Sequence, residues 1–145
     1  MSWRIFQKWF NTQPWDGVEC FEGNHGEKFW IYWRDNEEDI AKLRVLYRGH
    51  HIGHVIAEEK KHRLIIHDIS VLKRYRKRGV GKGMMQEIVQ WATGNDFQEI
   101  YGFISPGEDT TLEYLQEWYK RQGFKVYEVK PGVFHILLKL EDAVI

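Results

Sequence analysis

The sequence is poor in the features that mark disulfide-stapled, membrane-spanning or highly charged proteins. Its single cysteine, Cys20, excludes a disulfide within the chain and is typical of a reducing compartment. No apolar run approaches the length of a membrane-spanning helix, and the first four residues lack the apolar core of a signal peptide. We therefore expect a soluble, cytoplasmic protein without a membrane partner.

Net charge is also lacking, since 21 basic and 21 acidic residues cancel at pH 7. General nucleic-acid binders usually carry a basic excess, so a nucleic-acid partner is not expected. Aromatic residues, in contrast, are abundant: seven Trp, seven Tyr and eight Phe in 145 residues. A chain of this length forms one core, and aromatic side chains bury large areas in it. We expect residues 1–145 to form a single domain.

The strongest pattern lies between Arg63 and Asn95. The β-branched run from Leu64 to Val71 has the length of a buried strand. A basic loop with five cations at positions 73–78 follows, and a glycine-rich turn at 79–83 then leads into an amphipathic helix that Gly94 and Asn95 are suited to end. The apolar face of this helix is formed by Met84, Met85, Ile88, Val89 and Ala92.

A strand, a glycine turn and a helix in series are typical of an anion site. The first helical turn has backbone N–H groups without internal partners, and glycines allow an oxyanion to approach the backbone closely. The alternative is a tight turn beside a solvated run of charge. However, six cations near these glycines would repel one another without an anion. The pattern favours a phosphate or pyrophosphate ligand.

The remaining pattern predicts strands at 18–22, 29–33, 41–47, 52–58, 99–104, 125–129 and 133–140, an acidic connection at 35–39, and a helix within 2–12. Thr110 to Glu113 has the pattern of a capping box that opens another helix, which Gly123 ends. Strands joined by a helix should be parallel. We therefore expect a mixed α/β fold whose mostly antiparallel sheet has one parallel pair and flanking helices.

The spacing of the glycines excludes two phosphate-binding motifs. A mononucleotide P-loop fails because Arg76 and Gly83 stand where glycine and a hydroxyl belong, and the dinucleotide motif fails at Met84. The remaining pattern, Arg76-x-x-Gly79-x-Gly81, resembles the acetyl-CoA signature [QR]-x-x-G-x-[GA] of the GNAT superfamily of N-acetyltransferases. Residues 118–124 (WYKRQGF) resemble the family's second motif, and 52–54 (IGH) its "I-G-aromatic" strand. The resemblance covers roughly residues 41–124.

The resemblance implies an enzyme that transfers an acetyl group from acetyl-CoA, its cosubstrate, to a primary amine by direct attack in a ternary complex. It implies that Ile69, Ser70 and Val71 pair with the pantetheine arm and that the Val71 N–H polarises the thioester. Tyr119 would protonate the departing thiolate with an ordinary phenol pKa. The implied pyrophosphate-binding residues are Arg76, Lys77, Arg78, Gly79, Val80, Gly81, Lys82 and Gly83.

Several points stay open. His67 and Asp68 are both candidates for the base that takes the amine proton; as neighbours on a strand they should face opposite sides, so at most one faces the acceptor. A water chain or Glu58 is the alternative. The alternative for Tyr119 is a core aromatic, since it shares an apolar stripe with Leu112 and Leu115. No metal is expected, because the histidines at 50, 51 and 54 have no carboxylate or cysteine at ligand spacing.

The chain also departs from the family pattern. Leu112 stands where many members have Asn, so that contact would pass to Asp109, Thr110 or Thr111. The connection between Trp33 and Ala41 is too short for the helix pair that usually covers the acceptor site, which is therefore open or roofed by the aromatic residues 1–28. The acceptor, a small-molecule or protein amine, stays open, as do a homodimer, a nucleic-acid-binding role of residues 73–78, and an inactive CoA-binding regulator.

Overall fold

The computed structural model describes residues 19–37 and 39–140, so the helix expected within residues 2–12 lies outside the described part. The helices are α2 (Val80–Gly94) and α3 (Leu112–Arg121), with a short 3-10 turn, η1 (Lys73–Tyr75). The strands are β1 (Glu19–Glu22), β2 (Lys28–Glu37), β3 (Ile40–Tyr47), β4 (His50–Lys60), β5 (Arg63–Val71), β6 (Glu99–Phe103), β7 (Lys125–Lys130) and β8 (Val133–Lys139).

The described strands form one sheet in the order β1-β2-β3-β4-β5-β6-β8-β7. Every neighbouring pair is antiparallel except β5 and β6, which α2 connects. The expected mixed fold with one parallel pair is thus confirmed. The acidic connection expected at 35–39 is mostly strand among the described residues, because β2 continues through Glu37 and β3 begins at Ile40.

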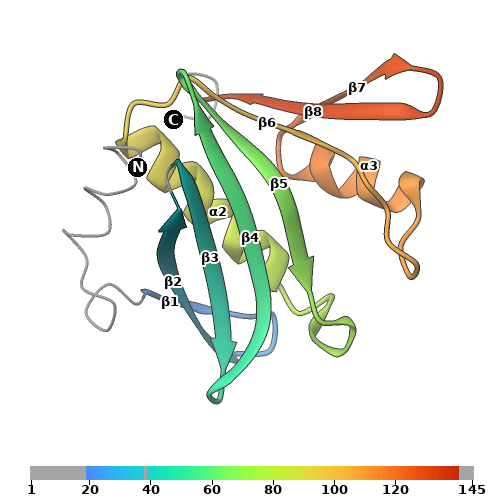
Figure 1. The fold of residues 1–145 in the computed structure, drawn as a ribbon. Coiled ribbons are helices and arrows are strands. Elements are labelled where there is room, and N and C mark those ends of the chain that lie inside the picture. Colours follow the sequence, from blue (N-terminus) through green and yellow to red (C-terminus); the bar gives the residue numbers. More distant parts are fainter. Residues whose placement is uncertain (1–18, 38, 141–145) are drawn as a thin grey trace.

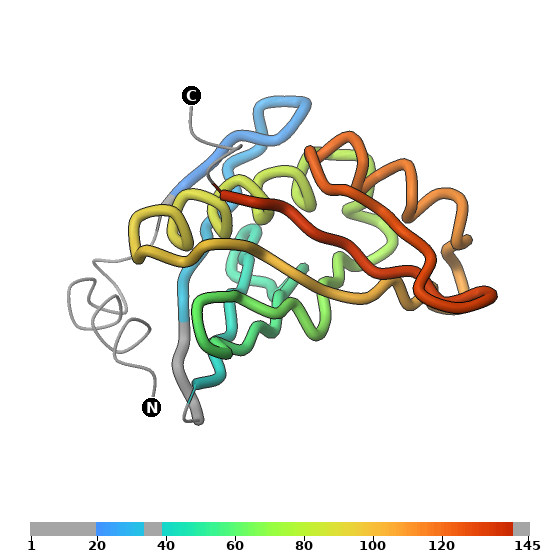
Figure 2. Tube along the Cα trace, turned by 90° about the horizontal axis from the view of Figure 1, so that it is seen from above, coloured from blue at the N-terminus to red at the C-terminus, as the bar shows by residue number. Residues whose placement is uncertain are grey.

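Both helices lie on the same side of the sheet (Figures 1 and 2). The side chains that β3 and β4 direct to the other side are mostly polar, including Lys42, Arg44, His54 and Glu58, and none is fully buried. We call this second side of the sheet the open face, because no helix of the described residues covers it.

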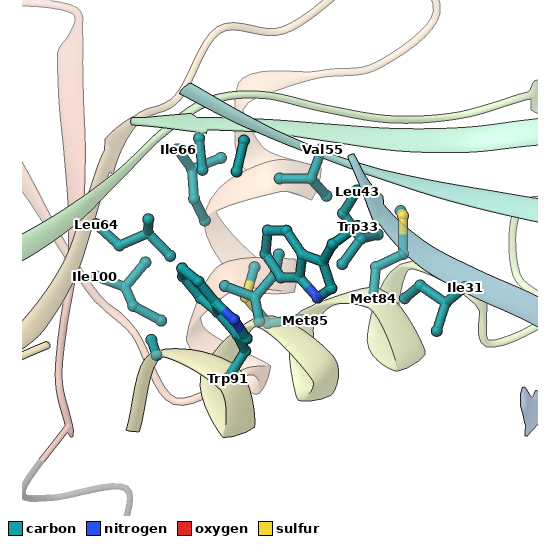
Figure 3. Close-up of a cluster of buried hydrophobic side chains, with 14 of the residues drawn as sticks. Ile31, Trp33, Leu43, Val55, Leu64, Ile66, Met84, Met85, Trp91 and Ile100 are labelled. Atoms are coloured by element: carbon teal, nitrogen blue, oxygen red, sulfur yellow. The ribbon is translucent and has the colours of Figure 1, made fainter. Parts of the chain in front are cut away.

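The core lies between the sheet and α2 (Figure 3). Alternation along β3 directs Ala41, Leu43 and Val45 toward the apolar face of α2, where they are at most 1% exposed. Trp33 and Trp91 stack with ring centroids 4.7 Å apart, and the Trp33 Nε1 donates to Glu87 Oε1 at 3.4 Å. Burying each such large apolar side chain contributes about 1.5–3 kcal/mol, which fixes α2 against the sheet.

The helix ends differ in detail from the sequence prediction. Gly94 is still helical, and Asn95 satisfies the end of α2 by donating from Nδ2 to the Trp91 carbonyl at 2.8 Å. The left-handed residue that turns the chain is Asp96, at φ 64°. α3 begins one residue later than the capping box implied, because the Thr111 Oγ1, rather than that of Thr110, accepts from the Tyr114 N–H.

Two glycines of α2 make a testable pair. A Cβ at Gly83 would lie 2.2 Å from Cε2 of Phe21, so Gly83→Ala should lower the free energy of unfolding by roughly 1–3 kcal/mol through overpacking. A Cβ at Gly94 meets no atom within 4 Å, so Gly94→Ala should raise it by about 0.5–1 kcal/mol. Urea unfolding measures both, and equal effects would contradict the packing described.

Candidate functional site

The strands β5 and β6 separate after a short parallel contact (Figure 1). Residues of β5 and of the segment after β6 line a cleft beyond that contact. The pairing of the two strands runs from Arg63 opposite Glu99 only to Ile66 opposite Gly102. Beyond that point β5 continues to Val71 beside β4 alone. A cavity of about 250 Å³ fills this gap, bounded by β5, the loop after it, the segment after β6, and α3.

Backbone groups of β5 face the cleft. The Leu72 N–H donates to the Ile52 carbonyl at 2.8 Å, and the register continues this pairing at Ser70 opposite His54. In an antiparallel ladder the residues between such pairs direct their N–H and C=O groups to the other neighbour, which here is the cleft. Ile69 and Val71 therefore present their N–H groups to the cavity, while the Val71 carbonyl accepts from the Arg76 Nε at 2.9 Å.

The loop of residues 76–79, which we call the anion loop, delivers the chain into α2. Gly79 is the N-cap at φ 89°, and the Gly83 N–H makes a bond to its carbonyl at 3.0 Å. The N–H groups of the three preceding helical positions, 80–82, have no carbonyl to accept them within the helix. The helix dipole adds partial positive charge at this end. Lys77 and Gly81 line the cavity, so the start of α2 borders it.

The structure brings most of the candidate residues to one cavity. Its lining includes Asp68, Ile69, Ser70, Val71, Arg76, Lys77, Gly81 and Tyr119. Six other candidates do not line it: His67, Arg78, Gly79, Val80, Lys82 and Gly83. Gly83 instead packs against Phe21.

Sequence reasoning missed part of the lining, namely Ser105, Gly107, Tyr114, Leu115 and Trp118. For Ser105 and Gly107, which follow β6 directly, the available signal was that ligands bind at the carboxyl ends of parallel strands, whereas Tyr114, Leu115 and Trp118 belong to α3. Asp109 and Thr110, suggested above as substitutes for an absent Asn, also line the cavity.

The arginines of the basic stretch are held by neighbouring groups. Arg76 and Asp109 both line the cavity, and the Nη1 of Arg76 lies 2.8 Å from the Oδ2 of Asp109. The Arg78 guanidinium lies 3.8 Å from Glu27, and Arg74 donates to the Tyr75 hydroxyl at 3.2 Å. The cation directed at the cavity without such an ion pair in the described residues is Lys77.

Tyr119 lines the cavity and is 4% exposed. Its ring packs edge-on against Trp118 and Phe124. Burial, with a smaller contribution from the negative charge of Asp68, raises the pKa of Tyr119 to about 12. The expectation of an ordinary phenol pKa was therefore wrong. The hydroxyl keeps its proton throughout the neutral range and is a permanent hydrogen-bond donor.

His67 and Asp68 face the same side of the sheet, contrary to the sequence prediction. Ile66 lies opposite Ala57 and Asp68 opposite Ile56, so His67 is an extra residue in a β-bulge. Asp68 Oδ2 is 2.7 Å from His54 Nε2, and His67 Nε2 is 2.8 Å from Glu58 Oε1. His54 and Glu58 are four residues apart on β4 and share the open face. Two histidine–carboxylate pairs thus lie side by side, and Asp68 also lines the cavity.

Comparison with known families agrees with this geometry. Residues 2–124 match the acetyltransferase (GNAT) family, while no curated protein matches the chain. Among the described residues, neither helix is long and apolar enough to cross a bilayer.

Solved structures show the same fold at low sequence identity. The GNAT domain of PAT from S. lividans has a TM-score of 0.71 at 9% identity, covering 84% of this chain and 96% of its own. PaiA N-acetyltransferase from Thermoplasma acidophilum, in complex with coenzyme A, matches 70% of this chain with a TM-score of 0.60 and 17% sequence identity. A Bacillus anthracis protein described as a putative streptothricin acetyltransferase, in complex with acetyl coenzyme A, has a TM-score of 0.60 and 22% sequence identity. The match covers 72% of this chain and 64% of the Bacillus chain. This chain spans 61% of the length of the Thermoplasma protein.

Because burial raises its pKa, Tyr119 should lose its proton at a higher pH in the folded protein than an exposed tyrosine does. Up to about pH 11 the phenolate absorbance of the wild type should nearly equal that of Tyr119→Phe, because the Tyr119 hydroxyl stays protonated. The stability gained by burying the neutral phenol is complete below its unfolded pKa of 10 and is lost between about pH 10 and 12. In concentrated urea the two proteins should differ by one phenol titrating near pH 10. If the folded wild type also shows one more phenol than Tyr119→Phe titrating near pH 10, burial does not raise the pKa of Tyr119.

Proposed function

This chain belongs to the acetyltransferase (GNAT) family, and from that premise we propose that it transfers an acetyl group from acetyl-CoA to a primary amine by direct attack in a ternary complex. One observation supports this most: a strand edge with free N–H groups and the start of a helix border the same cavity. The first suits an extended chain of amides, and the second suits a diphosphate. Coenzyme A has these two parts in series.

The anion loop and the first turn of α2 would hold the pyrophosphate through backbone N–H groups, with Lys77 as the nearest cation. Lys82, exposed on the first turn, could reach an outer phosphate. From there the pantetheine arm would run along β5 toward the point where the strands join. Its amides would pair with Ile69 and Val71 as an added strand would.

We place the thioester near Ile69. Tyr119 and Asp68 line the same cavity, and the charge of Asp68 adds to the burial that raises the pKa of the phenol, so we place the hydroxyl toward the Asp68 end of the cleft. Val71 is two residues nearer to the anion loop. The oxyanion donor therefore moves from the Val71 N–H, as the family resemblance implied, to the Ile69 N–H, and Val71 becomes a contact of the pantetheine arm. A backbone N–H directed at a developing oxyanion stabilises it without reorganisation.

In the proposed step, the amine nitrogen forms a bond to the acetyl carbon as the carbon–sulfur bond breaks. Asp68 takes the proton lost by the amine, and His54, 2.7 Å away, shares it and leads it toward solvent. Tyr119 donates a hydrogen bond to the departing sulfur. Its pKa of about 12 lies above that of an ordinary thiol, about 8.5, so it stabilises the thiolate without full proton transfer.

The acceptor amine would approach from the open face. Asp68 and its partner His54 lie on that side, while α2 and α3 cover the other. The acceptor is a small-molecule or protein amine. The direct test is release of free CoA from acetyl-CoA over a panel of amines, combined with calorimetry of CoA binding. Failure of CoA to bind at millimolar concentration would refute the proposal.

Matched variants test the assignment of the base. Asp68→Asn should lower kcat by about 10²-fold or more, because the amine proton loses its acceptor beside the reacting atoms. Glu58→Gln, which alters the neighbouring histidine pair outside the cavity, should leave kcat nearly unchanged. CoA affinity serves as the control and should stay constant in both. The reverse order of effects would transfer the role to His67 and Glu58.

Tyr119→Phe tests the donor to the sulfur. Because the hydroxyl acts only as charge develops on the leaving group, kcat should fall by roughly 10²-fold while the KM for acetyl-CoA changes little. Steady-state kinetics with a responsive amine measures both constants. An unchanged kcat would reduce Tyr119 to a core aromatic, which is the alternative that its packing against Phe124 allows.

A further inference from the structure

The turn between β1 and β2 is hydrogen-bonded to the anion loop, residues 76–79. Asn24 makes both contacts: its backbone N–H donates to the Arg78 carbonyl at 2.8 Å, and its side-chain Nδ2 donates to the Lys77 carbonyl at 3.1 Å. The two partners lie more than fifty residues further along the chain. Asn24 itself does not line the cavity.

These two bonds set the direction of the loop's donors. In a trans peptide, the N–H of one residue points opposite to the carbonyl of the residue before it. Because Asn24 holds the carbonyls of Lys77 and Arg78 on one side, the N–H groups of Arg78 and Gly79 point to the other side. Arg78 and Gly79 do not themselves line the cavity, but Lys77 before them and Gly81 after them do, so we infer that these two N–H groups point to the cavity side of the loop.

The loop needs this support, because its conformation is unusual and the fit is close. Lys77 has a φ of 62°, which a residue with a Cβ adopts rarely and at a cost. A Cβ at Gly79 would lie 2.9 Å from the Asn24 Oδ1, and a Cβ at Gly23 would lie 2.7 Å from the Arg78 carbonyl oxygen. The turn and the loop are therefore in direct contact along their backbones.

We propose that Asn24 is a positioning residue for the diphosphate: from outside the site, it turns two backbone N–H groups of the anion loop toward the phosphate oxygens. This rests on the proposed function, in which coenzyme A occupies the cleft. Asn24 adds no positive charge. It acts by taking the two carbonyls that would otherwise be free to turn toward the anion and repel it.

The test compares CoA affinity by calorimetry in the wild type and three variants. Asn24→Ala keeps the backbone bond to Arg78 but loses the side-chain bond to Lys77, and should weaken CoA binding roughly three- to tenfold. Asn24→Asp should weaken it further, because a carboxylate oxygen then faces the Lys77 carbonyl. Asn95→Ala is the matched control: it removes the same kind of bond, Nδ2 to the Trp91 carbonyl, at the far end of α2. It should lower the Tm yet leave CoA affinity within about twofold.

A second measurement separates positioning from general stability. Inorganic pyrophosphate, added to ¹⁵N-labelled protein, should shift the amide resonances of Arg78 and Gly79 in the wild type and in Asn95→Ala, with a weaker response in Asn24→Ala. If Asn24→Ala and Asn95→Ala bind CoA equally well, or if pyrophosphate moves both amides equally in Asn24→Ala and wild type, the inference is wrong. If the wild type binds neither CoA nor pyrophosphate, the proposed function fails, and the inference fails with it.

Discussion

The geometry of the candidate site depends on the point in the sheet at which β5 and β6 stop pairing. Their contact ends at Ile66 and Gly102, where a Cβ on the glycine would lie 3.1 Å from the Ile66 carbonyl oxygen. Immediately after it, the extra residue His67 bends β5. The backbone N–H groups of Ile69 and Val71, which β6 would have satisfied further along β5, are thereby left for a ligand. The cavity, the unpaired edge of β5 and the access to Asp68 all exist because the two strands stop pairing here.

The bulge has a chemical consequence as well. A regular strand would place neighbours on opposite faces, so His67 and Asp68 could not both reach β4 side chains of the open face. With one residue inserted, each meets a partner there, His54 for Asp68 and Glu58 for His67. The first pair touches the cavity while the second is displaced along the sheet. In the proposed reaction, this irregularity of one residue decides which carboxylate would act on the amine.

Local patterns made the fold and the anion loop predictable. The order of strand, glycine turn and helix between Arg63 and Asn95 depends on neighbouring residues, and the apolar face of α2 has the regular helical period. Side-chain assignments depended instead on distant partners. Arg78 turns to Glu27 and Arg76 to Asp109, and neither pairing has a sequence signal. The bulge at His67 and the burial that shifts the pKa of Tyr119 are also products of tertiary packing.

In the proposed function, the pairing of the arginines changes how the anion loop would attract the diphosphate. Ionised side chains beside carboxylates contribute little net field, so the guanidinium groups of Arg76 and Arg78 serve mainly to hold the cleft walls and the loop in place. The attraction then falls to oriented backbone N–H groups, the dipole of α2 and Lys77. Such donors are fixed in direction before the ligand arrives. In the proposed reaction the cofactor would lie beside α2 and α3 and the amine would arrive from the open face, so the acetyl group passes through the gap in the sheet that the two strands leave.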